Sequence, residues 1–272
     1  MSIETARLRL DVPPKMVDAE WRLDVSKAVQ AEMFGALTQG GLYEPETTRT
    51  IAAILKPGDT FIDVGAHIGY FTVLGGHLVG PTGRVLAFEP NHENFARCEE
   101  NVERNGTASW TTLREQAVGD YIGIAHLHRN LDNDGGHALW DPGLLENNPR
   151  SQKQPQVVDV PMTMLDESIR NVPPTLIKID AEGSECMVLR GADALLSGAN
   201  IPFVIAEINR FGLQEMGSSE QAVRGLMREY GYADCYLIPY TEEGKLEILP
   251  DDITVAGNHV FNLLWAAPGA TF

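Results

Sequence analysis

Short apolar runs alternate with segments of helical spacing through most of the chain. This pattern predicts strands over 60–64, 84–88, 110–118, 175–179 and 203–206, and helices over 68–79, 91–105, 184–197 and 218–230. Strands separated by helical crossovers form a parallel sheet that is covered by helices on both faces. The sequence therefore predicts an α/β fold.

The chain before residue 46 has a different pattern. Apolar residues from Val17 to Leu37 have mixed helical spacing, and Gly40-Gly41 follows as a stop signal. A further helix is predicted from Pro45 to Leu55. We therefore expect an N-terminal helical cap over 1–45 and a second, larger domain over 46–272.

Two other segments depart from the alternation. Residues 121–160 are rich in Asn, Asp, Gly and Pro and are too long for a simple connection, so we expect a substrate lid there. Near the end of the chain, 232–240 and 259–265 have the character of two strands. They would add an antiparallel strand to the sheet.

Composition and charge exclude several classes of protein. The 272 residues are 43% hydrophobic, and 21 basic against 38 acidic residues give a net charge of −17. Nucleic acids and anionic membranes need clustered Lys and Arg, so we expect neither as a partner. No apolar run reaches about 18 residues, the length that spans a bilayer. Three separated cysteines and the lack of a signal peptide predict a cytoplasmic protein with reduced thiols.

Candidate ligand-binding residues follow the predicted strands, where open α/β sheets bind their ligands. Asp63 lies in the first run, and Gly65 and Gly69 follow in a turn that leads into a helix with unpaired N–H groups. Glu89 follows the second run and can accept hydrogen bonds from ribose hydroxyls. The dinucleotide pattern G-x-G-x-x-G fails at His67 and at the last position, which disfavours NAD.

Four stretches resemble the motifs of the FkbM family of methyltransferases: GDTFIDVGAHIGYFT, FEP, AVGD and IKIDAEGSECMVLRGA, between about Leu42 and Glu207. The resemblance implies a class I, Rossmann-like fold with a seven-stranded, mostly parallel sheet, helices on both faces and an antiparallel last strand. It also implies S-adenosylmethionine as cofactor and methylation, mostly of oxygen, on small secondary metabolites or sugars. The family usually has Asn where this chain has His67.

The resemblance also implies a set of cofactor-binding positions. The turn after the first strand would surround the methionine part, Glu89 would hold the ribose, and the end of the third strand would lie beside the adenine. Tyr43 would close over the cofactor, unless it packs in the core. The cofactor-binding set is Asp63, Gly65, His67, Gly69, Glu89, Gln116, Ala117, Tyr43 and Asp180.

A hydroxyl acceptor requires a base, and three residues are candidates. Asp180 follows the fourth strand, although it can instead cap the next helix. Glu207 follows the fifth strand, although it can form an ion pair with Lys178 or Arg210. His137 lies in the long loop and has a suitable ordinary pKa, although it can be an exposed loop residue.

Substrate contacts are expected from Trp140, His137 and Glu182. Trp140 can cover an aromatic acceptor or anchor the loop, and the charge of Glu182 can simply favour a helix N-terminus. His126 and His128 share one strand face, but their spacing matches no closed zinc site, so we expect no metal.

The function that these residues predict is O-methylation of a small molecule in secondary metabolism, by in-line transfer with a carboxylate base. N- or C-methylation of an aromatic, indole or alkaloid-like acceptor is the alternative within the same fold. A non-catalytic S-adenosylmethionine-binding module is the alternative of another class. Trp21 and Phe34 of the predicted N-terminal helix could also contact a second copy in a homo-oligomer.

Overall fold

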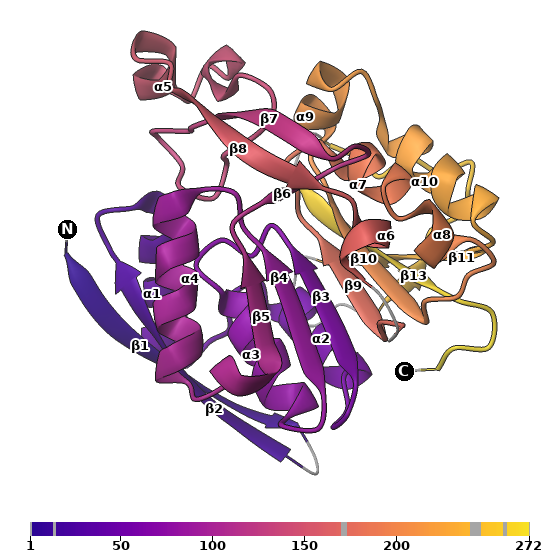
Figure 1. Ribbon diagram of the computed structural model, residues 1–272, viewed down its shortest axis with the longest axis horizontal. Coiled ribbons are helices and arrows are strands. Elements are labelled where there is room, and N and C mark those ends of the chain that lie inside the picture. The colour runs from indigo at the N-terminus through magenta and orange to yellow at the C-terminus, as the bar shows by residue number, and fades with distance from the viewer. Residues whose placement is uncertain (1, 13–14, 170–172, 240–245, 258–259, 272) are drawn as a thin grey trace.

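An eight-stranded sheet lies at the centre of the molecule (Figure 1). The computed structural model describes residues 2–12, 15–169, 173–239, 246–257 and 260–271. In spatial order the strands are β12 (Glu247–Ile248), β11 (Asp234–Ile238), β13 (Phe261–Ala266), β10 (Phe203–Ile208), β9 (Leu176–Ile179), β3 (Thr60–Val64), β4 (Arg84–Phe88) and β5 (Thr111–Arg114).

The sheet confirms the predicted mostly parallel arrangement. The five strands from β10 to β5 run parallel to one another, and β13 pairs antiparallel with both β10 and β11. The expected count was seven, and the two-residue β12 adds an eighth strand at the edge. The predicted ends Tyr240 and His259 of the last two strands lie outside the described residues.

Helices cover both faces because side chains alternate along each buried strand. In β3, Phe61 joins one apolar cluster and Ile62 joins the other. The first cluster contains α2 (Pro45–Ile54), α3 (Tyr70–Val79) and α4 (His92–Arg104). The second contains α7 (Glu185–Arg190), α8 (Asp193–Leu196), α9 (Arg210–Glu215) and α10 (Glu220–Glu229).

The predicted helix over 184–197 is two helices, α7 and α8. Between them Gly191 packs so closely on another turn that a Cβ would lie 1.9 Å from the carbonyl oxygen of Gly119. Such a close approach requires glycine at this position, which directly follows α7.

The predicted helical cap over 1–45 is wrong in its first half. Residues before α1 (Ala28–Thr38) form an antiparallel hairpin of β1 (Ile3–Val12) and β2 (Lys15–Asp24). The reason is a period of two: in β2 every second residue from Val17 to Leu23 is buried, as expected for a strand with one face on the core. This face packs against α3 and α4.

Trp21 of β2 is fully buried in this hairpin. Its ring stacks on Tyr70 at 4.9 Å, and its Nε1 donates a hydrogen bond to the Gly69 carbonyl oxygen at 3.3 Å. The indole therefore has its contacts within the chain and is not available to a second copy, contrary to expectation.

A second sheet lies beyond the ends of β4 and β5 (Figure 1). The predicted strand over 110–118 divides into β5 and β6 (Ala117–Val118), and β6 joins β8 (Val157–Thr163) and β7 (Gly123–His128) in the order β6-β8-β7. The segment expected as a lid thus contains β7 and most of β8, an antiparallel pair joined by residues 129–156. Short helices complete the fold: η1 (Ala108–Trp110), η2 (Pro142–Leu144), α5 (Pro149–Lys153) and α6 (Leu165–Ser168). Among the described residues, no helix is both long and apolar enough to cross a bilayer.

Candidate functional site

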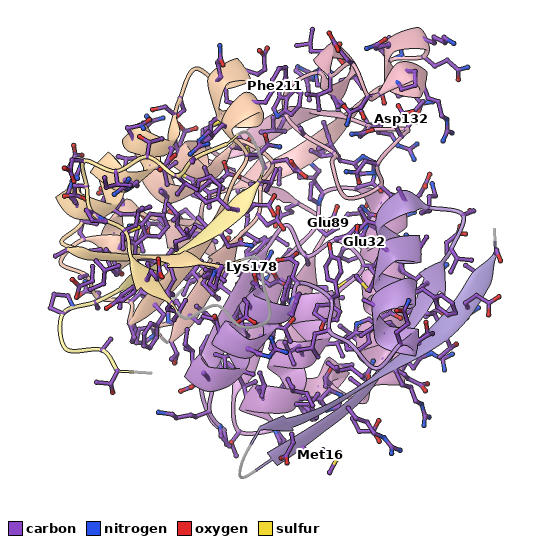
Figure 2. All side chains as sticks on the ribbon, turned by 180° about the vertical axis from the view of Figure 1, so that it is seen from behind. Met16, Glu32, Glu89, Asp132, Lys178 and Phe211 are labelled. Atoms are coloured by element: carbon purple, nitrogen blue, oxygen red, sulfur yellow. The ribbon has the colours of Figure 1, made fainter. Side chains whose placement is uncertain are left out.

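A cavity of about 270 Å³ opens at the carboxyl ends of β3, β4, β9 and β10. Figure 2 shows Glu89 and Glu32 near the centre of the molecule, with Lys178 close to them, and all three line this cavity. The site residues predicted from the sequence that line it are Tyr43, Gly65, His67, Glu89, Gln116, Ala117, His137, Asp180, Glu182 and Glu207. Asp63, Gly69 and Trp140 do not belong to its lining.

Strained backbone is concentrated around the cavity. Glu44, His67 and Glu182 line it and have positive φ angles of 41°, 52° and 48°. Ala199 is the remaining non-glycine residue of this kind in the described chain, and it lies elsewhere. Residues other than glycine rarely adopt this conformation, and those that do gather at functional sites. The backbone thus marks this cavity independently of the side chains.

The turn after β3 requires glycine for reasons of packing. Gly65 has a φ of +81°, and a Cβ there would lie 1.8 Å from the Asp180 carbonyl oxygen. Gly69 immediately precedes α3 and lies beside Cys98, and a Cβ added at Gly69 would lie 2.8 Å from the Cys98 Sγ. Gly69 therefore brings α3 and α4 together beneath the cavity instead of lining it.

Glu89 is held rigidly at the end of β4. Its two carboxylate oxygens accept backbone N–H groups of His67 and Asn91, each at 2.8 Å, and the residue is 6% exposed. Burial is the main reason that the pKa of Glu89 is raised to about 7. Each carboxylate oxygen has a further lone pair, so the group can still accept hydroxyl donors from the cavity.

Asp134 fastens the loop after β7 to the cavity wall. Its carboxylate contacts His67 Nε2 at 3.0 Å and accepts the Val29 N–H at 2.9 Å and Gln30 Nε2 at 3.0 Å. Burial opposes ionisation, but the hydrogen bonds and charge of His67, together with Gln30, outweigh it and lower the pKa of Asp134 to about 2. Sequence reasoning missed this role, because nothing local in the loop indicates contacts with α1 and the β3 turn.

Lys178 is a buried cation beside the cavity. It is 1% exposed, its Nζ lies 2.9 Å from Asp180 Oδ2, and it sits 4.7 Å from the centre of the Phe71 ring. Burial lowers its pKa, but the neighbouring Asp180, Glu44 and Asp63 carboxylates raise the pKa overall. The period of two along β9 puts Lys178 and Asp180 on one face, where this pair forms.

Neither ion pair expected for Glu207 is present. Lys178 pairs with Asp180, and Arg210 pairs with Glu220 at 2.7 Å. Burial, and then the negative charges of Asp180 and Glu182, raise the pKa of Glu207 well above its ordinary value.

Glu182 carries a similarly perturbed carboxyl group. Burial and the charge of Asp180 raise its pKa to about 8, while Asn209 Nδ2 donates to it at 2.7 Å. It is partly buried and lines the cavity, so it is not an exposed charge at a helix N-terminus.

His137 lines the cavity, but when neutral its free ring nitrogen carries a proton and can only donate a hydrogen bond. Its Nδ1 accepts the backbone N–H of Asn130 at 2.9 Å, so a neutral ring carries its proton on Nε2. Burial, followed by the charges of His67 and Arg129, lowers its pKa to about 4. This arrangement leaves no free basic nitrogen, so it gives no support to His137 as the base.

The remaining candidates lie outside the cavity. Trp140 Nε1 donates to the Glu182 carbonyl oxygen at 2.6 Å, and its ring lies 5.3 Å from that of Phe211, so it anchors the loop to the body. Asp63 is fully buried and accepts the Thr72 hydroxyl at 2.6 Å. His126 pairs with Asp159 at 2.7 Å on the exposed face of β7 and β8.

Comparison with known proteins identifies relatives of this chain. Hexuronic acid methyltransferase AglP of Haloferax volcanii is 27% identical over 170 residues, which are 61% of this chain and 62% of that protein. The chain thus covers less than two thirds of that relative. The 31-O-demethyl-FK506 methyltransferase FkbM of Streptomyces tacrolimicus is 29% identical over 203 residues, which are 65% of this chain and 74% of that protein.

A solved structure with a similar chain path is an S-adenosylmethionine-dependent O-methyltransferase of Thermotoga maritima. It is 14% identical and has a TM-score of 0.47, with 96% of this chain and 78% of that one covered.

Residues 63–233 match the family described as the methyltransferase FkbM domain. These residues contain most of the cavity and more than half of the chain. We conclude that the protein belongs to the FkbM family of S-adenosylmethionine-dependent methyltransferases.

Proposed function

We propose that this enzyme transfers a methyl group from S-adenosylmethionine to a hydroxyl of a small molecule in secondary metabolism, and that the cavity at the strand ends is where it does so. The observation that carries the proposal is the position of Glu89 and Glu207 in one cavity. A rigid carboxylate suited to a ribose lies at the end of β4, and a carboxylate without an ion-pair partner lies in β10.

The donors and charges of the cavity fit this cofactor. The free lone pairs of Glu89 suit a ribose diol, and the side-chain amide of Gln116 suits the edge of an adenine. The lining contains six carboxyl side chains against one lysine, so it favours a cation such as a sulfonium. We propose the cofactor-binding set given above without Asp63 and Gly69, which would support the site from beneath.

S-adenosylmethionine supplies a methyl group that is already activated. The protein then has to align the acceptor, exclude water and take up a proton. The Oε atoms of Glu207 are suited to the proton, because burial raises the pKa of this group towards the working range of a base. A positive charge bound nearby favours the carboxylate form, so Glu207 would be ionised when the site is loaded. Asp180 would orient the acceptor, held in place by Lys178.

The acceptor is proposed to be small because the names of the two curated relatives refer to a hexuronic acid and to 31-O-demethyl-FK506. The second name also refers to an oxygen. N- and C-methylation would use the same carboxylates, so only analysis of the methylated product separates them from O-methylation.

The first experiment is calorimetric binding of S-adenosylhomocysteine, with NAD as the control ligand. We expect micromolar binding of S-adenosylhomocysteine alone, weakened at least about ten-fold in Glu89→Gln, because the variant loses a charge-assisted acceptor. Glu99→Gln is the matched control, since Glu99 is exposed on α4. Binding of NAD instead, or equal affinity in Glu89→Gln, would refute the assignment of the pocket.

Turnover then separates an enzyme from a binding module. Glu207→Gln is expected to lose about 10²–10⁴-fold in kcat with hydroxylated acceptors while its affinity for S-adenosylhomocysteine stays unchanged. If wild type and variant are equally inactive with every hydroxylated and indolic acceptor tested, the result would favour a non-catalytic S-adenosylmethionine-binding module over an enzyme.

A further inference from the structure

Three carboxylates meet on one side of the cavity. Each of Glu44, Asp180 and Glu207 offers an oxygen, and these oxygens all lie within 4.8 Å of one another. Glu44 precedes α2, Asp180 follows β9, and Glu207 lies in the neighbouring β10. We refer to these three residues as the carboxylate cluster.

The spacing of the carboxylate cluster fits a single ion. Three oxygens spread evenly around one ion are √3 bond lengths apart, which is about 3.6 Å for Mg²⁺ and about 4.2 Å for Ca²⁺. The three oxygens lie within 4.8 Å of one another, so they can reach one cation if they move together by up to about 1 Å.

The charge also fits. When ionised, the cluster carries −3, and the Lys178 ammonium on Asp180 reduces this to −2. Lys178 contacts Asp180 Oδ2, which leaves Oδ1 of the same carboxylate for an ion. A divalent cation would neutralise the group.

Asn262 of β13 provides an independent indication of a ligand. It is 7% exposed, lines the cavity and is the strand partner of Glu207. Its Nδ2 donates to Glu44 Oε2 at 3.2 Å and to Thr47 Oγ1 at 3.1 Å, which fixes the orientation of the amide. Its Oδ1 is buried without a partner in the described chain. Buried amide oxygens are normally satisfied, and amide oxygens are also good ligands for hard cations.

We propose that the carboxylate cluster, together with Asn262 Oδ1, binds one divalent cation, Mg²⁺ or Mn²⁺, with water and acceptor oxygens completing its coordination. The sequence predicted no metal, because the group considered was His126 and His128 with Asp132 and Asp134 after them, and not the carboxylates at the strand ends. The role of the ion rests on the proposed function: it would hold the acceptor hydroxyl and lower the pKa of that hydroxyl. Glu207 can serve both as ligand and as base because a carboxylate has two oxygens.

The test is binding of Mn²⁺ alone to the full chain after removal of metals with a chelator. Loss of the electron paramagnetic resonance signal of free Mn²⁺ reports binding, and Mg²⁺ is added as competitor. We expect one Mn²⁺ per chain and a Kd at least about ten-fold higher in Glu207→Gln. Asn262→Ala should weaken binding several-fold. Glu32→Gln is the matched control, because Glu32 lines the same cavity outside the cluster, and its Kd should stay within about two-fold.

Two results would overturn the proposal. One is no binding of Mn²⁺ by the wild-type chain at about 1 mM, a concentration that fills even weak oxygen sites. The other is an equal loss of affinity in Glu32→Gln and Glu207→Gln, which would indicate diffuse attraction by negative charge.

Calorimetry with S-adenosylhomocysteine on the same samples separates this proposal from the one above. If Mn²⁺ binds and S-adenosylhomocysteine does not, the metal site stands and the proposed function fails. If S-adenosylhomocysteine binds to every variant and Mn²⁺ to none, including wild type, the variants are folded and the metal site fails.

Discussion

Asp134→Asn tests whether the loop after β7 is fastened by a charged group. Asp134 is 6% exposed and holds His67, Gln30 and the backbone of Val29. Its pKa falls from 3.8 to about 2. A difference of about 1.8 pKa units corresponds to about 2.4 kcal/mol, at 1.36 kcal/mol per unit. We therefore expect Asp134→Asn to lower the free energy of unfolding by about 2 kcal/mol near pH 7.

The pH dependence has a definite sign. Because the folded pKa lies below the unfolded one, the stabilisation is present above about pH 4 and is lost as the pH falls towards about 2. The difference between wild type and Asp134→Asn should thus shrink to about 1.3 kcal/mol at about pH 3.

Urea unfolding of both proteins at several pH values measures this difference. Asp159→Asn is the control, because its partner His126 is exposed and such a pair contributes less than about 1 kcal/mol. A loss below about 0.5 kcal/mol in Asp134→Asn, or a difference that does not change with pH, would refute the reasoning.

Three further substitutions test other parts of the structure. Trp21→Ala should cost about 3–5 kcal/mol in urea unfolding, because the indole is fully buried, and a loss below about 1.5 kcal/mol would contradict the hairpin packing. Gly65→Ala should lower Tm far more than Gly217→Ala: both residues have positive φ, but only at Gly65 would a Cβ meet backbone. Glu182→Gln should gain free energy of unfolding relative to wild type as the pH rises from about 5 to about 8. The reason is that wild type must ionise a carboxyl group whose pKa is higher in the folded protein than in the unfolded chain. A difference in urea unfolding that stays constant over this pH range would contradict the raised pKa.

The central strands could be predicted because buried parallel strands are short apolar runs with sharp ends. The bounds of β3 and β4 are the predicted ones, 60–64 and 84–88. The N-terminal hairpin of β1 and β2 could not be predicted in the same way. The alternation in β2 continues directly into the apolar positions of α1, and the combined segment has spacings of both kinds. The pairing of β2 with β1 and its contacts with α3 and α4 select the strand.

The same distinction applies to the site. Glu89, Asp180 and Glu207 were predicted from one topological rule, since the carboxyl ends of parallel strands share an edge. Asp134 contacts Val29, 105 residues away, and Asn262 contacts Glu44, 218 residues away. Spacing along the chain contains no information on such pairs. They depend on the final positions of a loop and of the antiparallel strand.

The pairing of β13 with β10 links the fold to its chemistry. The last strand, β13, lies between β10 and β11 and not at an edge of the sheet. This position places Asn262 opposite Glu207. The amide of Asn262 then contacts Glu44 just before α2, while Lys178 forms its ion pair with Asp180. The carboxyl groups of Glu44 and Glu207 form no ion pair in the described chain, and burial raises the pKa of both. Such an arrangement opposes ionisation in the free protein and favours it once a cationic ligand is bound, so the affinity for that ligand is coupled to the release of protons.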